Sequence, residues 1–296
     1  MNKLGLVTVL YNSDDVLEGF FKSVASQSYT DYVLYIVDNS PSSATRSLLK
    51  QLNTQFKITG ITHIENEINT GVAAANNTGI KKAFEDGCTD FIILNNDIVF
   101  EDVNTFATLV DIANNNIADI IAPKIYYYGT KKIWYAGGSF NKWKGGIKHF
   151  GDRQEDKGLY DKPAYVSYAP TCFVYIKGEV FKKTGLMDET YFVYCDDLDF
   201  MYRALQHGFR LYYLPNPFIF HKISSSTGGT LSAFGIYYVT RNRIFFVRKF
   251  LRAPVKPIAL FYTWFSLSVL LLISHKRNLI KKLNAGFADG FKLKAK

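Results

Sequence analysis

The sequence contains few cysteines. The 296-residue chain has Cys88, Cys172 and Cys195, an odd number of thiols at wide spacing. This set excludes a disulfide framework and a cysteine-rich zinc site, and it fits a reducing compartment. The first ten residues lack the basic start and the long apolar run of a secretion signal, so we expect no signal peptide. Disorder is excluded too, because 48% of the residues are hydrophobic.

Acidic residues are nearly absent from the C-terminal tail. Residues 248–296 hold eleven of the 35 basic residues but only one of the 26 acidic residues, Asp289. The rest of the chain is close to neutral, so the net charge of +9 belongs to the tail. A nucleic-acid-binding protein usually spreads basic residues over a folded face. We therefore expect no nucleic-acid partner.

The tail also contains an uncharged apolar run, Ile258–Ser274. As a helix it would span roughly 26 Å, slightly less than the hydrocarbon core of a bilayer at about 30 Å. Basic residues flank the run on both sides, which favours a helix that lies in the membrane interface. A helix that crosses the membrane and a buried helix of the folded domain are the alternatives. We expect residues 248–296 to contact a membrane surface.

Apolar runs alternate with helical patterns in the first half of the chain. We expect strands at Leu4–Leu10, Tyr32–Val37, Ile58–Ile64 and Phe91–Leu94, and helices from Ser13 or Asp14 to about Gln27, through Leu48 and Leu52, and over Gly71–Phe84. This alternation predicts an open α/β sheet, in which ligands bind beyond the carboxyl ends of the strands. For the second half we expect an irregular hairpin at Tyr126–Trp143, a polar loop at Lys144–Lys162, strands at Cys172–Ile176 and Leu211–Leu214, and a helix at Asp197–His207.

Six short motifs follow one another along this framework. They are VTVLYN (Val7–Asn12), VDNS (Val37–Ser40), NTGVAAANNTGI (Asn69–Ile80), LNND (Leu94–Asp97), YFVYCDDLDFMYR (Tyr191–Arg203) and His221. Together they resemble the family 2 glycosyltransferases with the GT-A fold. The resemblance is strongest to the rhamnosyltransferase-like branch that builds bacterial surface polysaccharides such as O antigen. It implies a GT-A catalytic domain at 1–245, an open mixed sheet flanked by helices, followed by a helical membrane-associating tail at 246–296.

The resemblance assigns a metal and a base to two acidic motifs. Asp97 is expected to hold Mg²⁺ or Mn²⁺ at the donor diphosphate, and His221 to complete the metal shell. Asp197 is expected to act as the general base of an inverting transfer, with Asp196 raising its pKa. Turn formation at Asp97 and helix capping at Asp197 are the structural alternatives.

Further residues are expected to bind the nucleotide sugar. Asp38 matches the family's position for a base-binding carboxylate, although an Asp that caps the turn before Pro41 is the alternative. Asn95 stands where the family often has another Asp. The remaining donor-binding candidates are Asn12, Gly71, Asn76, Asn96 and Arg241, and Asn77 and Lys222 are secondary ones. Gly71 is expected to let the backbone approach the donor closely.

The resemblance implies transfer from a nucleotide-sugar donor, dTDP-rhamnose or a UDP-sugar, to a lipid-linked oligosaccharide acceptor. We expect the protein at the cytoplasmic face of the inner membrane, bound peripherally or monotopically. One rival is a sugar nucleotidyltransferase, but Tyr11–Asp14 replaces the Gly-rich, Arg-containing loop that it needs. A non-catalytic binding subunit is the other rival, and it should lack the base, which is present as Asp197. The sequence does not indicate an oligomeric state.

Overall fold

A computed structural model describes residues 3–222 and 231–295. Residues 1–2, 223–230 and 296 belong to the predicted domain and tail but lie outside the described residues.

One large mixed sheet organises the molecule. Its path runs β10-β12-β6-β11-β4-β1-β2-β3, with β5 paired to β12 and β7 paired to β6, and β8 and β9 form a separate ribbon. β1 is parallel to β2 and β4, whereas β11 is antiparallel to β4 and β6. The strands are β1 (Leu4–Leu10), β2 (Tyr32–Asp38), β3 (Ile61–Glu65), β4 (Asp90–Leu94), β5 (Ile98–Val99), β6 (Ile120–Tyr127), β7 (Ile133–Tyr135), β8 (Gly138–Asn141), β9 (Gly146–His149), β10 (Ala164–Tyr165), β11 (Phe173–Lys177) and β12 (Leu211–His221).

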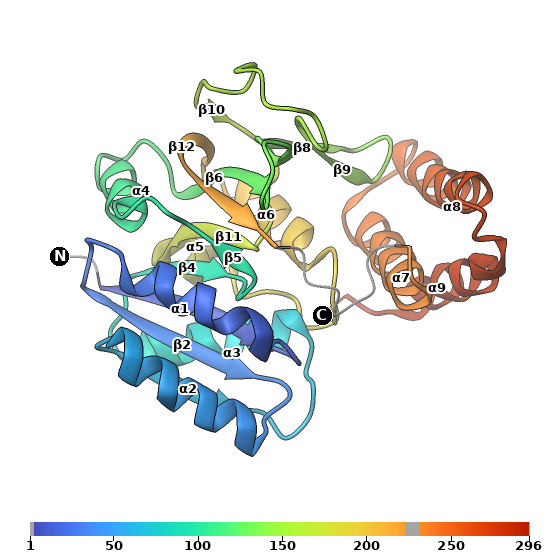
Figure 1. Ribbon diagram of the computed structural model, residues 1–296. Coiled ribbons are helices and arrows are strands. Elements are labelled where there is room, and N and C mark those ends of the chain that lie inside the picture. Colours follow the sequence, from blue (N-terminus) through green and yellow to red (C-terminus); the bar gives the residue numbers. More distant parts are fainter. Residues whose placement is uncertain (1–2, 223–230, 296) are drawn as a thin grey trace.

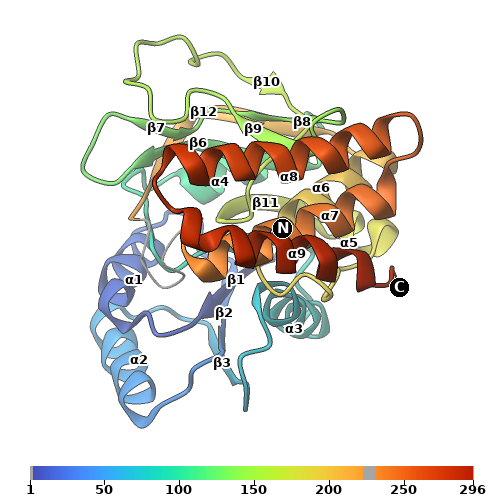
Figure 2. The same ribbon diagram turned by 90° about the vertical axis from the view of Figure 1, so that its right-hand side faces the viewer.

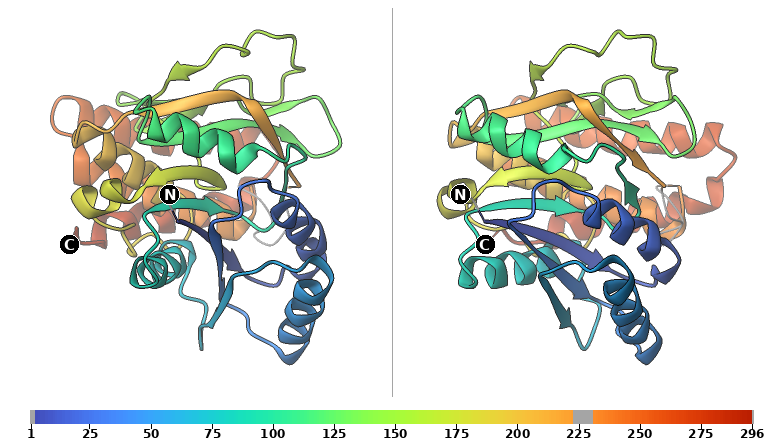
Figure 3. Two further views of the ribbon diagram at one scale, coloured as in Figure 1. Left: turned by 90° about the vertical axis from the view of Figure 1, so that its left-hand side faces the viewer. Right: turned by 60° about the vertical axis from the view of Figure 1, so that its left-hand side comes forward.

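Helices cover both faces of the sheet. Figure 1 shows α1 and α2 in front of the parallel strands and α3 behind them, against β1 and β2. Figure 3 brings the left-hand side of the Figure 1 view toward the viewer, and the C-terminal helices then lie faintly behind the sheet. The helices are η1 (Asp14–Val16), α1 (Leu17–Ala25), α2 (Ser43–Phe56), α3 (Val72–Glu85), α4 (Thr105–Asn114), α5 (Gly178–Thr184), α6 (Asp196–Gln206), α7 (Ala233–Phe250), α8 (Val255–Ile273), η3 (Arg277–Leu279) and α9 (Ile280–Lys292).

The open α/β sheet predicted from the sequence is confirmed, with corrections to single elements. The third strand begins at Ile61 rather than Ile58, and the helix expected at Ser13 opens with the 3-10 turn η1. The predicted loop Lys144–Lys162 is wrong in part, because residues 146–149 form β9 and pair with β8. The last strand, β12, continues to His221 instead of ending at Leu214.

The three C-terminal helices pack side by side (Figure 2). Helix α9 lies against α7 at Gly286 and Gly290, where a Cβ atom would meet the carbonyl oxygens of Tyr237 and Arg241 at 2.5 Å. The absence of side chains at these two positions therefore permits close contact between the helices. The boundary expected between residues 245 and 246 falls inside α7.

Helix α8 buries only one side. Ala259, Thr263, Leu267 and Leu271 are buried at every fourth position, whereas Phe261 and Phe265 are at least half exposed. Within the described part of the chain, α8 is the one helix long and apolar enough to cross a membrane by length and composition.

Candidate active site

Strand pairing brings Asp97 next to His221. Asp97 precedes the short strand β5, and β5 pairs with the end of β12 so that His221 stands opposite Ile98. The Nε2 atom of His221 lies 3.1 Å from Oδ1 of Asp97. Both side chains are buried. The sequence-predicted metal pair is thus brought together from positions 124 residues apart by the fold.

A carboxylate beside an imidazole suits a divalent cation such as Mn²⁺. No group of three or more His, Cys, Asp and Glu side chains forms a metal centre among residues 3–222 and 231–295. A cation held by Asp97 and His221 therefore needs further ligands from its substrate, and diphosphate oxygens are suitable ones. The metal assignment stays a prediction.

Asp196 and Asp197 open helix α6. The two preceding residues, Tyr194 and Cys195, have φ angles of 65° and 64°, a left-handed conformation that is unfavourable for residues with a side chain. The buried Asn242 of α7 stabilises this turn, because its Nδ2 donates to the carbonyls of Val193 (2.7 Å) and Tyr194 (2.9 Å). Helix α7 thereby positions the backbone that carries the predicted base.

Burial raises the pKa of Asp197, and the hydroxyl of Tyr168 opposes this shift. Tyr168 donates a hydrogen bond to Oδ2 of Asp197 at 2.5 Å. The expected effect of Asp196 on the pKa of Asp197 stays a prediction. Burial raises the pKa of Asp196 as well, and the neighbouring charge of Asp197 raises it further.

A continuous series of rings connects the two acidic positions. The ring of His221 lies 4.8 Å from Trp134, and Trp134 lies 4.8 Å from His149. His149 stacks on Tyr168 at 5.5 Å, and Tyr168 holds Asp197. The series therefore runs from the Asp97–His221 pair to the predicted base.

The Cys172 thiol gives a second link between the two acids. Burial raises its pKa, and the charges of Asp97 and Asp197 raise it further. The Cys172 carbonyl also accepts the N–H of Asn95 in the Asp97 motif. Both carboxylates thus lie near one buried side chain.

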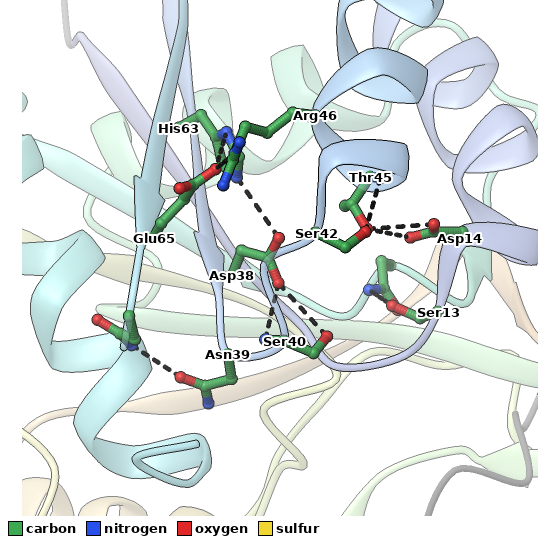
Figure 4. A network of polar contacts seen from close by, with 12 residues as sticks. Ser13, Asp14, Asp38, Asn39, Ser40, Ser42, Thr45, Arg46, His63 and Glu65 are labelled. Carbon is green, nitrogen blue, oxygen red and sulfur yellow. Dashed lines mark hydrogen bonds and ion pairs between the residues drawn. The ribbon is translucent and has the colours of Figure 1, made fainter. Parts of the chain in front are cut away.

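Asp38 ends β2 within a network of polar contacts (Figure 4). Its Oδ1 accepts the backbone N–H of Ser40 at 2.9 Å, so the turn-capping alternative is present. Its Oδ2 lies 3.6 Å from Nε2 of His63 on the neighbouring strand β3. The side chain is fully buried, and its contact with a nucleotide base stays a prediction.

Gly71 is the N-cap residue of helix α3 and has a φ angle of 83°. A Cβ atom at Gly71 would lie 2.4 Å from the carbonyl oxygen of Phe192, so this glycine permits close contact between α3 and the segment before the acidic pair. The side chain of Asn77 donates to the Met187 carbonyl and accepts the Met187 N–H, as expected for a buried polar network. Asn76 is buried on the same helix.

The remaining candidates lie at the loop ends of the sheet and on α7. Asn12 is exposed and donates its N–H to the hydroxyl of Ser40, while Asn96 is buried and donates to Ser13 at 2.7 Å. Asn95 is exposed beside Asp97. Arg241 bonds the carbonyl of Thr190 and stacks on Tyr238. The donor contacts of these residues stay predictions.

Three residues of the ring series were not among the predicted site residues. Trp134, His149 and Tyr168 come from β7, β9 and the segment before β11. Their one signal in the sequence is the aromatic-rich stretch from Tyr126 to Tyr168. Their neighbours depend on the packing of separate segments, which short motifs do not encode.

A sequence model of the family described as Glycosyl transferase family 2 matches residues 6–179, more than half of the chain. The chain belongs to glycosyltransferase family 2. The matched region includes Asp38, Asp97 and Tyr168, and it ends before the acidic pair at 196 and 197. A comparison with curated proteins found no match.

Solved glycosyltransferase structures share the fold of this family 2 enzyme. The mannosyltransferase PcManGT from Pyrobaculum calidifontis, in complex with GDP-Man and Mn²⁺, has a TM-score of 0.61 at 14% identity, covering 99% of this chain and 76% of the other. S. aureus TarS 1-349 in complex with UDP-GlcNAc has a TM-score of 0.65 at 15% identity, covering 98% and 81%. GalNAc-T7 with UDP, GalNAc and Mn²⁺ has a TM-score of 0.67 at 19% identity, and the match covers 99% of this chain but 56% of GalNAc-T7.

The expected GT-A fold is therefore confirmed, and the family 2 enzyme is a glycosyltransferase. The similar structures contain nucleotide sugars or nucleotides, and two of them contain Mn²⁺.

Proposed function

We propose that the enzyme transfers one sugar, with inversion, from a nucleoside-diphosphate donor to a glycan acceptor. Asp197 acts as general base, and Asp97 and His221 hold a divalent cation. The observation that carries this proposal is the series of rings with the Asp97–His221 pair at one end and Asp197 at the other. The reaction needs a cation at the donor diphosphate and a base at the acceptor hydroxyl, both close to the reacting carbon.

The proposed reaction is a single displacement. The acceptor oxygen forms a bond to the anomeric carbon while the bond from that carbon to the diphosphate oxygen breaks. Asp197 takes the acceptor proton, and the diphosphate leaves with the bonding electron pair. When bound, a divalent cation supplies positive charge to the departing diphosphate. Burial raises the pKa of Asp197, which makes its carboxylate a stronger base than an exposed one.

The proposed donor is dTDP-rhamnose or a UDP-sugar, and the proposed product is a bacterial surface polysaccharide such as O antigen. The similarity of the six motifs to the rhamnosyltransferase-like branch supports this choice. Asp38 supports it as well, since a carboxylate can accept the imide N–H that uracil and thymine share.

Asp197→Asn tests the base directly. Hydrolysis of isotope-labelled UDP-sugars and dTDP-rhamnose with Mn²⁺ should fall by about 10²–10⁴-fold, because the proton acceptor is lost. Donor-dependent stabilisation against melting should persist, since Asn keeps the shape of the side chain. Asp97→Asn should weaken both hydrolysis and Mn²⁺-dependent donor binding.

Asp111→Asn, an exposed change on α4, is the matched control and should leave both measurements unchanged. Full donor turnover by Asp197→Asn would contradict the assignment of the base.

We further propose that α8 lies on the cytoplasmic face of the inner membrane, where the acceptor is lipid-linked. Its exposed side presents Phe261 (63% exposed) and Phe265 (50% exposed), which stack on each other. Basic residues precede and follow the helix, so charge attraction to anionic lipid would add to apolar insertion. Because the opposite side of α8 is buried against the domain and against α7 and α9, this arrangement favours a helix that lies on the membrane. In this proposal the residues after 245 act as the membrane-associating unit.

The double change Phe261→Ser and Phe265→Ser tests the membrane contact. Co-sedimentation with vesicles that contain phosphatidylglycerol should weaken by about tenfold or more, because two aromatic anchors are lost. Val103→Ser, at an apolar position that is 46% exposed just before α4, should bind as the unchanged protein does. Equal binding by all three proteins would refute the proposed contact.

A further inference from the structure

A cavity of about 470 Å³ lies away from the proposed transfer site, between β6, β12 and the loop at 156–161. In the register of β12 with β6, Phe220 pairs with Tyr126 and His221 pairs with Tyr127. Successive side chains of a strand point to opposite faces of a sheet. Because Tyr126 and Phe220 line the cavity, it opens on the face opposite to His221.

Aromatic rings form one wall of the cavity. Phe218 is 38% exposed, and its ring lies 5.2 Å from Tyr126 and 5.6 Å from Phe220. A solvent-exposed ring beside a cavity can stack on the apolar C–H face of a pyranose. This wall would supply the apolar part of a sugar site.

Polar groups lie beside the aromatic wall. Lys124 is 2% exposed, and its Nζ contacts Oδ2 of Asp156 at 2.8 Å and Oδ1 of Asp161 at 2.5 Å. Tyr126 also donates its hydroxyl to Asp156. The Asp161 side chain is 57% exposed, so it can accept hydrogen bonds from a ligand. The buried lysine thus fixes two carboxylates in place at the cavity, as a preformed site requires.

The charges of the cavity favour a neutral ligand. Lys124 and Lys131 balance Asp156 and Asp161 among the lining residues. A phosphate or a nucleotide would meet two carboxylates here, whereas sugar hydroxyls can donate to them and accept from lysine.

We propose that this cavity binds a neutral sugar unit of the acceptor glycan, outside the transfer site. The identification of the ligand as acceptor glycan rests on the proposed function. Retention of the acceptor chain at a second position raises its effective concentration at the base.

The test is saturation-transfer NMR on the full chain with methyl α-rhamnoside, methyl β-galactoside and methyl β-N-acetylglucosaminide at millimolar concentration, with and without UDP. We expect at least one glycoside to receive saturation that persists when UDP is added. Phe218→Ala should weaken this binding by about tenfold, because the stacking surface is lost. Asp161→Asn, an exposed change that preserves shape, should weaken it as well.

Ile147→Ala removes another exposed apolar side chain, on β9, and should bind the glycoside normally. The proposal is overturned if no glycoside binds, if UDP displaces it, or if Phe218→Ala and Asp161→Asn bind as the unchanged protein does. Asp197→Asn should retain the NMR signal. If Asp197 is not the catalytic base, the glycoside-binding result is therefore unaffected, and the two proposals can fail separately.

Discussion

At the scale of single residues, a hydrogen bond from Tyr168 lowers the proton affinity that burial gives Asp197. Its hydroxyl donates to the carboxylate at 2.5 Å, and its ring stacks on His149. Burial raises the pKa of Asp197, and this hydrogen bond lowers it in part by stabilising the charged form. In the proposed mechanism, this residue therefore acts on catalysis through the base.

Tyr168→Phe should move the acidic limb of the kcat profile to higher pH. Without the hydroxyl, the pKa of Asp197 rises further, so the carboxylate loses its charge at a higher pH than in the unchanged enzyme. Loss of a hydrogen bond to a charged group should move the limb by about one pH unit or more. At a pH below the limb, kcat should therefore be about tenfold lower than in the unchanged enzyme. The measurement is donor hydrolysis as a function of pH.

Tyr135→Phe is the matched control for this change. Its hydroxyl is equally buried but donates to the carbonyl of Tyr168, so its loss should lower stability and leave the acidic limb in place. Identical pH profiles for Tyr168→Phe and the unchanged enzyme would contradict the role of Tyr168.

The sequence indicated the acids of the site better than their surroundings. Asp97 and His221 were predicted from ordered motifs, and the structure places them 3.1 Å apart. His149 has no motif around it, and its position between Trp134 and Tyr168 arises from the packing of β7, β9 and the segment before β11.

At the scale of elements, the turn before α6 depends on a side chain from α7. Tyr194 and Cys195 are both left-handed, and Asn242 donates to the carbonyls of Val193 and Tyr194. The side-chain oxygen Oδ1 of Asn242 in turn accepts a hydrogen bond from Nε of Arg241. The conformation of the turn is thus maintained by a helix about fifty residues further along the chain.

Asn242→Ala should lower kcat by about tenfold or more and change donor affinity little. Two partly buried carbonyls would lose their donor, at a cost of up to about 1–3 kcal/mol each, and the turn would relax away from its strained conformation. Hydrolysis rates and donor-dependent melting shifts measure the two effects separately.

Thr240→Val changes another buried polar residue of α7, whose hydroxyl bonds only within the helix, to Ile236. It should reduce stability and preserve kcat. A similar loss of kcat in both variants would assign the effect of Asn242 to general destabilisation.

Secondary structure was predictable where one physical signal dominates. The strand Leu4–Leu10 is buried almost throughout, and its continuous apolar run was sufficient to find it. Strand β9 was missed because it lies in a two-stranded ribbon with exposed residues and has no apolar run. Strand β12 passes through Pro215 and Pro217 with a shift of register between Leu214 and Ile219, so the pattern of a regular strand ends early in the sequence.

At the scale of the whole molecule, α7 connects the catalytic domain to the C-terminal helices. One side of α7 supplies Asn242 to the turn before Asp196, and another side receives α9 at Gly286 and Gly290. Arg248 adds bonds from α7 to the carbonyls of Gly290 and Leu293. The sequence indicated the basic and apolar character of this region but not its contacts, because two glycines do not form an apolar pattern.

Gly290→Val should loosen α9 from α7. The new side chain would meet the Arg241 carbonyl and the Ile244 side chain, and overpacking of this kind costs about 1–3 kcal/mol. For a chain of this size each kcal/mol lowers Tm by about 2–4 °C. Thermal unfolding measures the change, and donor hydrolysis should fall with it.

Ala288→Val places the same side chain on the exposed face of α9 and should have little effect on either. Equal Tm values for the two variants would contradict the close packing.

The shared position of α7 has a practical meaning for experiments that shorten the protein. A chain cut at residue 250 keeps every sequence motif but loses the helices that pack against α7, the helix whose Asn242 supports the turn before the proposed base. Inactivity of such a fragment would reveal nothing about lipid. Dependence on a bilayer must instead be sought with changes confined to the outward side of α8.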